Sequence, residues 1–320
     1  MSSRELKTRA RIFEADTSSF REQFNRSSFT FSHNLAGSPL FELPRLIELA
    51  ESLTSKGGGK VAFQSGHIPV NQGWHSTPSR APSVIEAIEG IQESGSWVLL
   101  KSVQHDPPYR ALLERCLTEI EALTGVPLRQ EITWSEAYIF IASPRSVTPY
   151  HIDHESNFLL QIRGNKEISV FDPDDRSVLT EEEIERYYVG DLSGAVYREE
   201  NQCKARVYQL TPGMGVHHPI RAPHWVKNGD SYSVSFSVNF FMRAYDRQAR
   251  VYQCNHYLRK LGIRPTAPGK SSLRDRLKIY TMNKLDNRHP ENKSELLRSG
   301  VERLTSPALL VRQIMDRIKR

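Results

Sequence analysis

Cysteine is scarce in this chain: only Cys116, Cys203 and Cys254 occur among 320 residues, and they lie far apart. Three widely spaced cysteines argue against a disulfide framework. Long apolar runs are also missing, so no stretch approaches the roughly 20 residues that span a bilayer. The first ten residues contain no apolar signal region. We therefore expect a cytoplasmic protein with reduced thiols and no membrane segment.

An excess of charge of one sign is absent as well. The chain has 43 basic and 37 acidic residues, a formal net charge of +6, and the two signs are interspersed. Without a clustered basic stripe, we do not expect nucleic acid as a partner. The hydrophobic content of 38% is ordinary, so a chain of this length can bury one large core together with accessory helices.

One short segment carries the chemical information. His151 and Asp153 are separated by a single residue, and His224 lies far downstream. Alternate residues of a strand point to one face, so His151 and Asp153 can reach one ion, and a barrel can return His224 beside them. Two imidazoles and one carboxylate with open opposite positions are typical of non-haem Fe(II) oxygenases. A buried histidine beside an aspartate is also a common hydrogen-bonded pair, so the spacing alone leaves both interpretations open.

Two blocks of sequence carry a likeness to a known family. The first runs through Thr148-Pro149-x-His151-x-Asp153, Asn157-Phe158, Gln161-Ile162-x-Gly164-x-Lys166 and Asp172-Pro173-Asp174. The second contains Pro212-Gly213, Pro219, His224 and Ser237-Val238-Asn239-Phe240-Phe241. Together they span roughly a third of the chain. This pattern resembles the JmjC-type branch of the 2-oxoglutarate oxygenases in the cupin superfamily, and within it the asparaginyl hydroxylases that modify hypoxia-inducible factor.

The resemblance implies that His224 is the third metal ligand, because only this histidine lies at the family's interval in the second block. We expect His217 and His218 to be ordinary strand residues, one facing in and one facing out. We expect His154 to point away from the metal, because it is adjacent to Asp153.

A 2-oxoglutarate enzyme needs a cation for the far carboxylate of the cosubstrate, whose near end chelates iron. The resemblance gives this role to Lys166, which opens a strand in phase with the family's lysine; a solvated lysine at a turn exit is the alternative. The hydroxyl of Thr148 and the amides of Asn157 and Asn239 would orient the cosubstrate, or else serve as caps and turn residues. The implied cofactors are Fe(II), 2-oxoglutarate as cosubstrate and O2.

Hydrophobic periodicity predicts the main elements of secondary structure. We expect helices over about 44–55, 82–93, 108–124 and 181–188, and strands over 97–100, 136–142 and 232–240. The last strand alternates apolar and polar residues, and its polar side is expected to face the barrel interior. Residues 1 to about 35 read as irregular.

The resemblance implies a mainly β fold with flanking α-helices: a double-stranded β-helix, also called a jelly roll or cupin fold, of JmjC-like type. We divide the chain into an N-terminal helical and strand region that packs on the barrel (1–130), a jelly-roll core (131–246) and a C-terminal helical appendage (247–320). The core carries an insertion near 174–208, and insertions at a barrel mouth often shape substrate access.

Charged helices are expected at 250–261, 273–282 and 306–320. Leu310, Val311, Ile314 and Ile318 form an apolar stripe on the last one, and such a stripe must be covered. Relatives of this branch dimerise through C-terminal helices, so the resemblance implies a homodimer. The alternatives are that these helices cover the barrel or bind another partner.

The function implied is an Fe(II)- and 2-oxoglutarate-dependent dioxygenase that hydroxylates an unactivated C–H bond and releases succinate and CO2. A peptide or protein side chain is the favoured substrate, and a free amino acid or natural product remains open, as does demethylation. Two other classes compete: a cupin metalloenzyme that does not use 2-oxoglutarate, and a metal-free barrel that only binds. Lys166 and Thr148 argue against the first, and the complete triad argues against the second.

Overall fold

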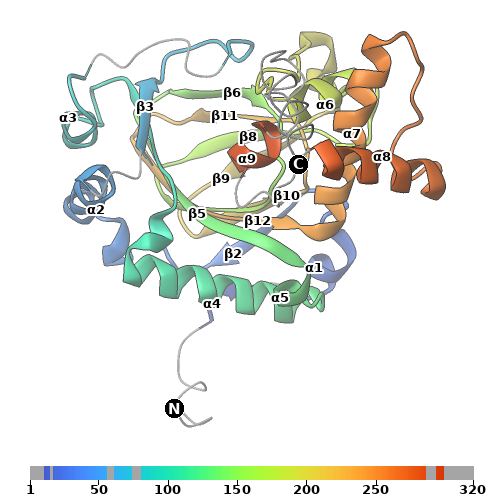
Figure 1. The fold of residues 1–320 in the computed structure, drawn as a ribbon. Helices are drawn as coiled ribbons and strands as arrows, with labels where there is room; N and C mark the ends of the chain where they lie inside the picture. The colour runs from blue at the N-terminus through green and yellow to red at the C-terminus, as the bar shows by residue number, and fades with distance from the viewer. Residues whose placement is uncertain (1–10, 15–16, 56–60, 74–80, 286–292, 299–320) are drawn as a thin grey trace, which may run out of the picture.

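Two antiparallel sheets face each other in the computed structural model, with helices around them (Figure 1). The structure describes residues 11–14, 17–55, 61–73, 81–285 and 293–298. The larger sheet has eight strands in the order β1-β2-β10-β7-β12-β5-β4-β3, and the smaller has four in the order β6-β11-β8-β9.

The strands of the larger sheet come from both halves of the chain. In sheet order they are β1 (Phe13–Glu14), β2 (Phe29–His33), β10 (Met214–His218), β7 (Ser156–Arg163), β12 (Ser233–Met242), β5 (Ile132–Ala142), β4 (Ser96–Leu100) and β3 (Val61–Ser65). The smaller sheet consists of β6 (Val147–His151), β11 (His224–Asn228), β8 (Lys166–Val170) and β9 (Arg206–Leu210). From β5 to β12 the chain passes repeatedly from one sheet to the other, which is the winding of a double-stranded β-helix.

Helices cover the outside of the sheets. They are α1 (Thr17–Gln23), α2 (Leu43–Ser55), α3 (Val84–Glu89), α4 (Pro107–Thr124), α5 (Leu128–Glu131), α6 (Glu181–Tyr188), α7 (Arg243–Lys260), α8 (Ser272–Leu285) and α9 (Lys293–Arg298), with 3-10 turns η2 (Pro39–Phe41), η3 (Val103–His105) and η4 (Glu199–Lys204). In Figure 1, α4 and α5 run beneath β5 and β12, whereas α6, α7 and α8 gather at the right of the view, above α5.

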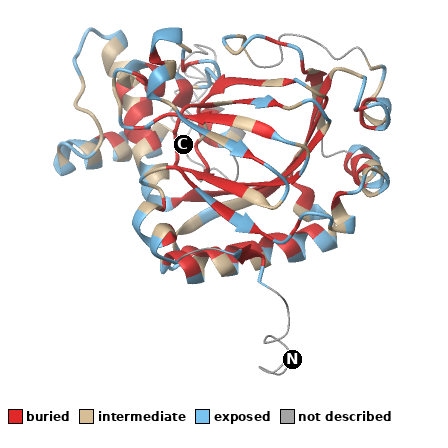
Figure 2. Cartoon of the chain, turned by 180° about the vertical axis from the view of Figure 1, so that it is seen from behind, coloured by how far each residue is buried: buried red, intermediate tan, exposed pale blue. Residues whose placement is uncertain are grey.

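The principal core lies between the larger sheet and the N-terminal helices. The apolar stripe of α4 packs there against Val234, Phe236, Val238 and Phe240 of β12. The alternate residues Ser233, Ser235, Ser237 and Asn239 are also buried, but on the opposite face. All ten residues of β12 are buried, and Figure 2 shows long buried stretches in the strands of the barrel. The period-two alternation turns the apolar residues of β12 toward the core under the helices and the polar residues toward the barrel interior.

The insertion after β8 folds as α6 followed by η4. Thr180 caps α6 with a capping box: its hydroxyl accepts from the Glu183 amide, and the Glu183 carboxylate accepts from the Thr180 amide. Tyr187 and Tyr188 at the end of α6 lie in a second apolar cluster with Tyr252 of α7 and Leu296 and Leu297 of α9. This packing brings the C-terminal helices to the same end of the barrel as the insertion.

The mainly β fold with flanking helices is confirmed, but two local expectations are wrong. Among the described residues before 35 (11–14 and 17–34), the chain is not irregular, since β1, α1 and β2 form there and β2 pairs with β10 along the larger sheet. The helix expected at 250–261 begins at Arg243, directly after β12. The apolar residues of these segments form only a weak pattern along the sequence. They are buried by contacts with barrel strands that are distant in the sequence.

Two further expectations are not settled by the architecture. The predicted helix 306–320 lies outside the described residues, and the boundaries at 130 and 246 stay a prediction. Within the described ranges, no helix combines the length and apolar character needed to cross a membrane.

Candidate metal centre and anion site

A cavity of about 310 Å³ lies between the two sheets. Its walls come from β6, β8 and β11 of the smaller sheet, β4, β5, β7, β10 and β12 of the larger sheet, and α6 and α9. All seven residues that the sequence selects are on these walls: Thr148, His151, Asp153, Asn157, Lys166, His224 and Asn239. The winding of the chain thus gathers residues up to 91 positions apart, as the numbering shows, into one chamber.

The two histidines face each other across neighbouring strands. His151 ends β6, His224 begins β11, and the two residues are register partners with ring centres 4.1 Å apart. Asp153 Oδ2 lies 3.4 Å from His151 Nε2 and 3.9 Å from His224 Nε2. The expectation that Asp153 shares a strand with His151 is wrong, because β6 ends at His151 and the loop after it carries the carboxylate.

Hydrogen bonds determine which nitrogen of each imidazole faces the carboxylate. His151 Nδ1 lies 2.7 Å from the Pro149 carbonyl and His224 Nδ1 lies 3.0 Å from the Ala222 carbonyl. A carbonyl only accepts, so both Nδ1 atoms carry the proton and both Nε2 atoms present a lone pair. Burial lowers the pKa of His224 to about 3, an effect that the neighbouring His151 strengthens. The neutral form that ligates metals is therefore the stable form of His224.

The donor set fits a metal ion. His151, Asp153 and His224 are the group of three potential ligands found within the described residues, with ligand atoms all within 4.8 Å of one another. Ligands at about 2.1 Å from an ion and at right angles lie about 3 Å apart, so small side-chain adjustments suffice. Two neutral imidazoles and one carboxylate suit Fe(II) with open positions left for other ligands.

Lys166 opens β8 at the other end of the same wall. It is a register partner of Asn228, four residues along β11 from His224, which pairs with Val170. Four steps along a strand are roughly 13 Å, so the lysine and the metal site are separated by room for a small molecule. Lys166 is 5% exposed, which excludes a solvated lysine at a turn exit.

In the part of the chain that the structure describes, the ammonium of Lys166 makes no ion pair and no hydrogen bond to a protein group. Burial lowers its pKa from 10.5 to about 7, and no neighbouring charge opposes this shift. A buried, unpaired ammonium is costly, and an anionic ligand in the cavity removes that cost.

The three remaining residues are bound into the walls. Trp97 Nε1 donates to the Thr148 hydroxyl over 3.0 Å. Asn157 Nδ2 donates to Ser237 Oγ over 2.7 Å and also contacts Asn239 Oδ1. Asn157 Oδ1 is buried without a partner among the described residues, so it can accept a bond from a ligand or water.

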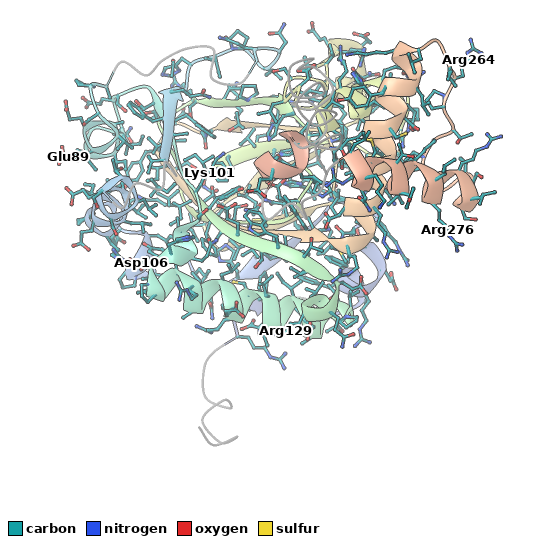
Figure 3. All side chains as sticks on the ribbon, in the orientation of Figure 1. Glu89, Lys101, Asp106, Arg129, Arg264 and Arg276 are labelled. Carbon is teal, nitrogen blue, oxygen red and sulfur yellow. The ribbon has the colours of Figure 1, made fainter. Side chains whose placement is uncertain are left out.

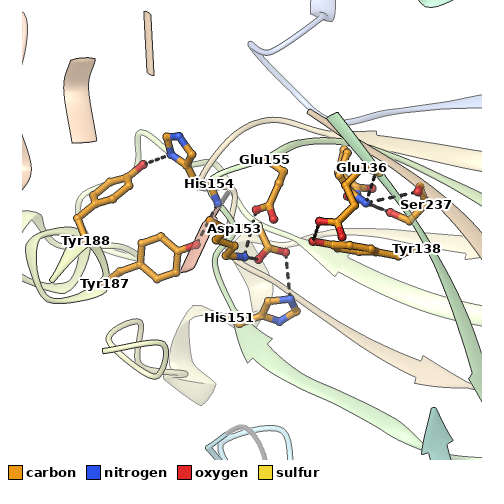
Figure 4. Close-up of polar contacts among 12 residues, drawn as sticks. Glu136, Tyr138, His151, Asp153, His154, Glu155, Tyr187, Tyr188 and Ser237 are labelled. Atoms are coloured by element: carbon orange, nitrogen blue, oxygen red, sulfur yellow. Dashed lines mark hydrogen bonds and ion pairs between the residues drawn. The ribbon is translucent and has the colours of Figure 1, made fainter. Parts of the chain in front are cut away.

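The other histidines need one correction. His217 packs in the principal core with its ring centre 4.5 Å from that of Phe158, and His154 bonds Tyr188 and Asp246 and points away from His151 (Figure 4). His218, expected to be an ordinary strand residue, lies on the cavity wall with its ring 4.2 Å from that of His224. Burial, followed by the nearby His224, lowers the pKa of His218 well below its usual range.

Sequence reasoning missed the charged residues that surround Asp153. Lys293 of α9 contacts Asp153 Oδ1 and lies 3.1 Å from Glu155 Oε2. Burial alone would raise the pKa of Asp153, but Lys293 and then the two imidazoles hold it well below its usual range. Glu155 could have been suspected from its place two residues after Asp153, whereas nothing in the sequence around Lys293 signals a role in the cavity.

Two more wall residues complete the chamber. Tyr138 donates to Glu136 Oε2 over 2.8 Å (Figure 4), and Lys101 lies with Nζ 6.0 Å from the centre of the Tyr138 ring. Figure 3 labels Lys101 in the interior of the view, whereas Arg264, between α7 and α8, and Arg276 of α8 project outward at the right-hand edge.

The match to a protein-family model agrees with this architecture. The family model described as a cupin-like domain matches residues 89–253, just over half of the chain. No curated protein matches. Similar solved structures include the ribosomal oxygenase YcfD of Escherichia coli, with 14% identity, 88% of this chain and 74% of that chain covered, and a TM-score of 0.45. Its complex with cobalt and 2-oxoglutarate gives the same identity and coverage and a TM-score of 0.47. The DMSP lyase DddQ of Ruegeria pomeroyi covers 33% of this chain and 38% of its own, with 14% identity and a TM-score of 0.22.

Proposed function

The chain belongs to the cupin-like domain family, and we propose that it is an Fe(II)- and 2-oxoglutarate-dependent dioxygenase of the JmjC type. It would hydroxylate an unactivated C–H bond and release succinate and CO2. The observation that carries this proposal is the unpaired ammonium of Lys166, buried in the same cavity as the His151, Asp153 and His224 donor set.

The three donors would hold the iron through His151 Nε2, Asp153 Oδ2 and His224 Nε2. Bound Fe(II) would couple the oxidative decarboxylation of 2-oxoglutarate to substrate hydroxylation. The backbone carbonyls of Pro149 and Ala222 keep both imidazoles in the ligating tautomer and orientation.

Lys166 would bind the far carboxylate of 2-oxoglutarate. A dicarboxylate can bridge the distance between the metal donors and Lys166, with one end at each, and the far end would supply the missing counter-charge. A charge-assisted hydrogen bond of this kind contributes about 1.5–3 kcal/mol. The unpaired Asn157 Oδ1, on the larger sheet, and the Thr148 hydroxyl, on the smaller sheet, line the same cavity and would orient the cosubstrate.

The cavity volume supports a small substrate portion over a large scaffold. About 310 Å³ is at the lower end of the range for ligand pockets, roughly 300–1,000 Å³. With 2-oxoglutarate inside, the remaining room suits a single side chain. We therefore propose a peptide or protein side chain as substrate, and a free amino acid is the second candidate.

The competing function is a cupin metalloenzyme that does not use 2-oxoglutarate. Anaerobic titration with Fe(II) and then 2-oxoglutarate distinguishes the two, because the iron chelate of a 2-oxo acid absorbs weakly in the visible range. We expect this charge-transfer band in the wild type and in Lys227→Ala, whose lysine is exposed on β11. Iron binding without the band at saturating 2-oxoglutarate would leave the competing function.

Cytoplasmic location and dimerisation stay proposals. Leu261 and Ile263, between α7 and α8, and Leu273, Leu277 and Tyr280, on α8, are exposed. A second copy covering them would form a homodimer. Light scattering on the purified full chain tests this, and a monomer at micromolar concentration would contradict it.

A further inference from the structure

Lys293 brings a positive charge into the cavity beside the metal donors. It is the first residue of α9, and the same helix buries Leu296 and Leu297 in the apolar cluster at the barrel mouth. Figure 1 shows α9 at the opening between the sheets. The two leucines anchor the helix, so the lysine at its start is directed inward.

The ammonium of Lys293 lies among two carboxylates and one aromatic ring. It contacts Asp153 Oδ1, lies 3.1 Å from Glu155 Oε2 and lies 5.8 Å from the centre of the Tyr187 ring. Carboxylates and the face of a tyrosine ring are the groups that bind cations. This arrangement holds one positively charged side chain, that of Lys293.

Glu155 is the member of this site that no metal role explains. It is 2% exposed and lies outside the group of three metal donors. Lys293 contacts its Oε2, whereas Oε1 is buried with no partner within the described ranges. A buried carboxylate requires a cation or further donors, and Glu155 can accept more bonds than Lys293 supplies.

The lysine lies beside the metal donors and not between them. It contacts Oδ1 of Asp153, whereas Oδ2 of the same carboxylate faces the two imidazoles. A cationic side chain at this position is therefore compatible with a metal bound through Oδ2.

We propose that the cavity takes substrates with a protonated, lysine-like side chain, that Glu155 is the carboxylate that recognises it, and that Lys293 is the chain's own occupant of the same position. This inference rests on the proposed function for the statement that the occupant is a substrate. An external cationic side chain must displace Lys293, so α9 competes with the substrate.

The test uses n-butylammonium as the probe and n-butanol as its neutral counterpart. Calorimetric titrations are made on the full-length protein loaded anaerobically with Fe(II), as wild type, Lys293→Ala and the double variant Lys293→Ala with Glu155→Gln. Removing Lys293 vacates the position, so we expect butylammonium to bind Lys293→Ala at least ten-fold more tightly than wild type. Glu155→Gln should weaken that binding at least ten-fold, and butanol should bind at least ten-fold more weakly than butylammonium.

Lys278→Ala is the matched control. This lysine of α8 bonds the Thr266 carbonyl over 2.8 Å, away from the cavity, so its removal should leave butylammonium binding as in wild type. Equal binding of amine and alcohol, or equal binding to the single and double variants, would overturn the proposal. If the double variant does not fold, the comparison of wild type with Lys293→Ala still decides, because equal affinities there exclude Lys293 as the occupant.

The proposed function is tested separately by adding 2-oxoglutarate to the same samples and recording the absorption band of the iron chelate. A chelate band together with binding that does not depend on Glu155 overturns the cationic site alone. Glu155-dependent binding of the amine without the band overturns the 2-oxoglutarate role and leaves a cation-binding cavity.

Discussion

Lys166 and Lys293 enter one cavity from opposite ends, and their pKa values move in opposite directions. Burial lowers the pKa of Lys166 to about 7, with no charge to oppose it. Burial also acts to lower the pKa of Lys293, but Asp153 and Glu155 outweigh it and raise that pKa well above its usual range. The difference teaches that one cation is already neutralised by the protein and the other is left for a ligand. At the Lys293 end of the cavity, carboxylates of the protein neutralise the lysine. At the Lys166 end, an anionic ligand would supply the counter-charge.

Removing the Asp153 carboxylate, at the Lys293 end of the cavity, should have the largest effect on iron binding and turnover. Asp153→Ala removes a metal donor and one partner of Lys293 at once, so we expect loss of iron binding and of all turnover. Iron content after anaerobic loading and succinate release measure the two. His151→Ala should behave alike, and undiminished iron binding in both variants would refute the triad.

At the Lys166 end of the cavity, Lys166→Ala should weaken the binding of 2-oxoglutarate and leave iron binding unchanged. The lost charge-assisted bond predicts a rise in the KM for 2-oxoglutarate on the order of 10–100-fold. Iron binding should be unchanged, since Lys166 is not among the metal donors. Lys227→Ala on the outer face of β11 is the control, and an unaltered KM in Lys166→Ala would remove this lysine from its role.

A pH series sharpens the contrast between the two lysines. Only protonated Lys166 attracts an anion, and its pKa of about 7 means that protonation is lost as pH rises through 7. The affinity for 2-oxoglutarate should therefore fall by up to roughly ten-fold per pH unit above 7. Lys166→Arg keeps its charge at all these pH values, so any binding that it retains should not decline between pH 7 and 9. An equal decline in both proteins would assign the pH effect to another group.

The smallest expected effect concerns stability without metal. Lys293→Met leaves Asp153 and Glu155 side by side without their cation, which should lower the free energy of unfolding. Lys293 and Asp153 are 23% and 25% exposed, so we discount the full cost of breaking a buried pair to about 1–2 kcal/mol. Urea unfolding of the metal-free protein measures it, and Lys278→Met serves as the comparison. An unchanged free energy would show that the Lys293 contacts do not stabilise the fold.

Local patterns predicted those parts of the fold whose signals lie within a few residues. The helix at 181–188 was predicted with its observed ends, and the structure shows that Thr180 and Glu183 form a capping box at its start. The polar face of β12 was predicted from its period-two alternation. The strand character of 29–33 was missed because its apolar residues are meaningful only beside β10.

The candidate site likewise contains residues that the sequence predicted and residues that only the structure revealed. His151, Asp153 and His224 stood out through their residue types and spacings, and the structure brings them together. The sequence did not show which of His217 and His218 lines the cavity. The pairing of β10 in the sheet places His218 on the cavity wall and His217 in the core. Lys293 could not be found at all, because its approach depends on how α9 packs on α6, far away in the sequence.

The sequence by itself determined the ligand types, the alternation that turns a polar face inward, and the presence of a lysine at the start of β8. Only the tertiary structure decided which lysine meets a carboxylate and which does not. The physical reason is that a side chain's charge partner is set by through-space packing of distant segments, whereas caps, alternation and donor chemistry are set by neighbours along the chain. That packing places Lys293 beside two carboxylates and leaves Lys166 without one.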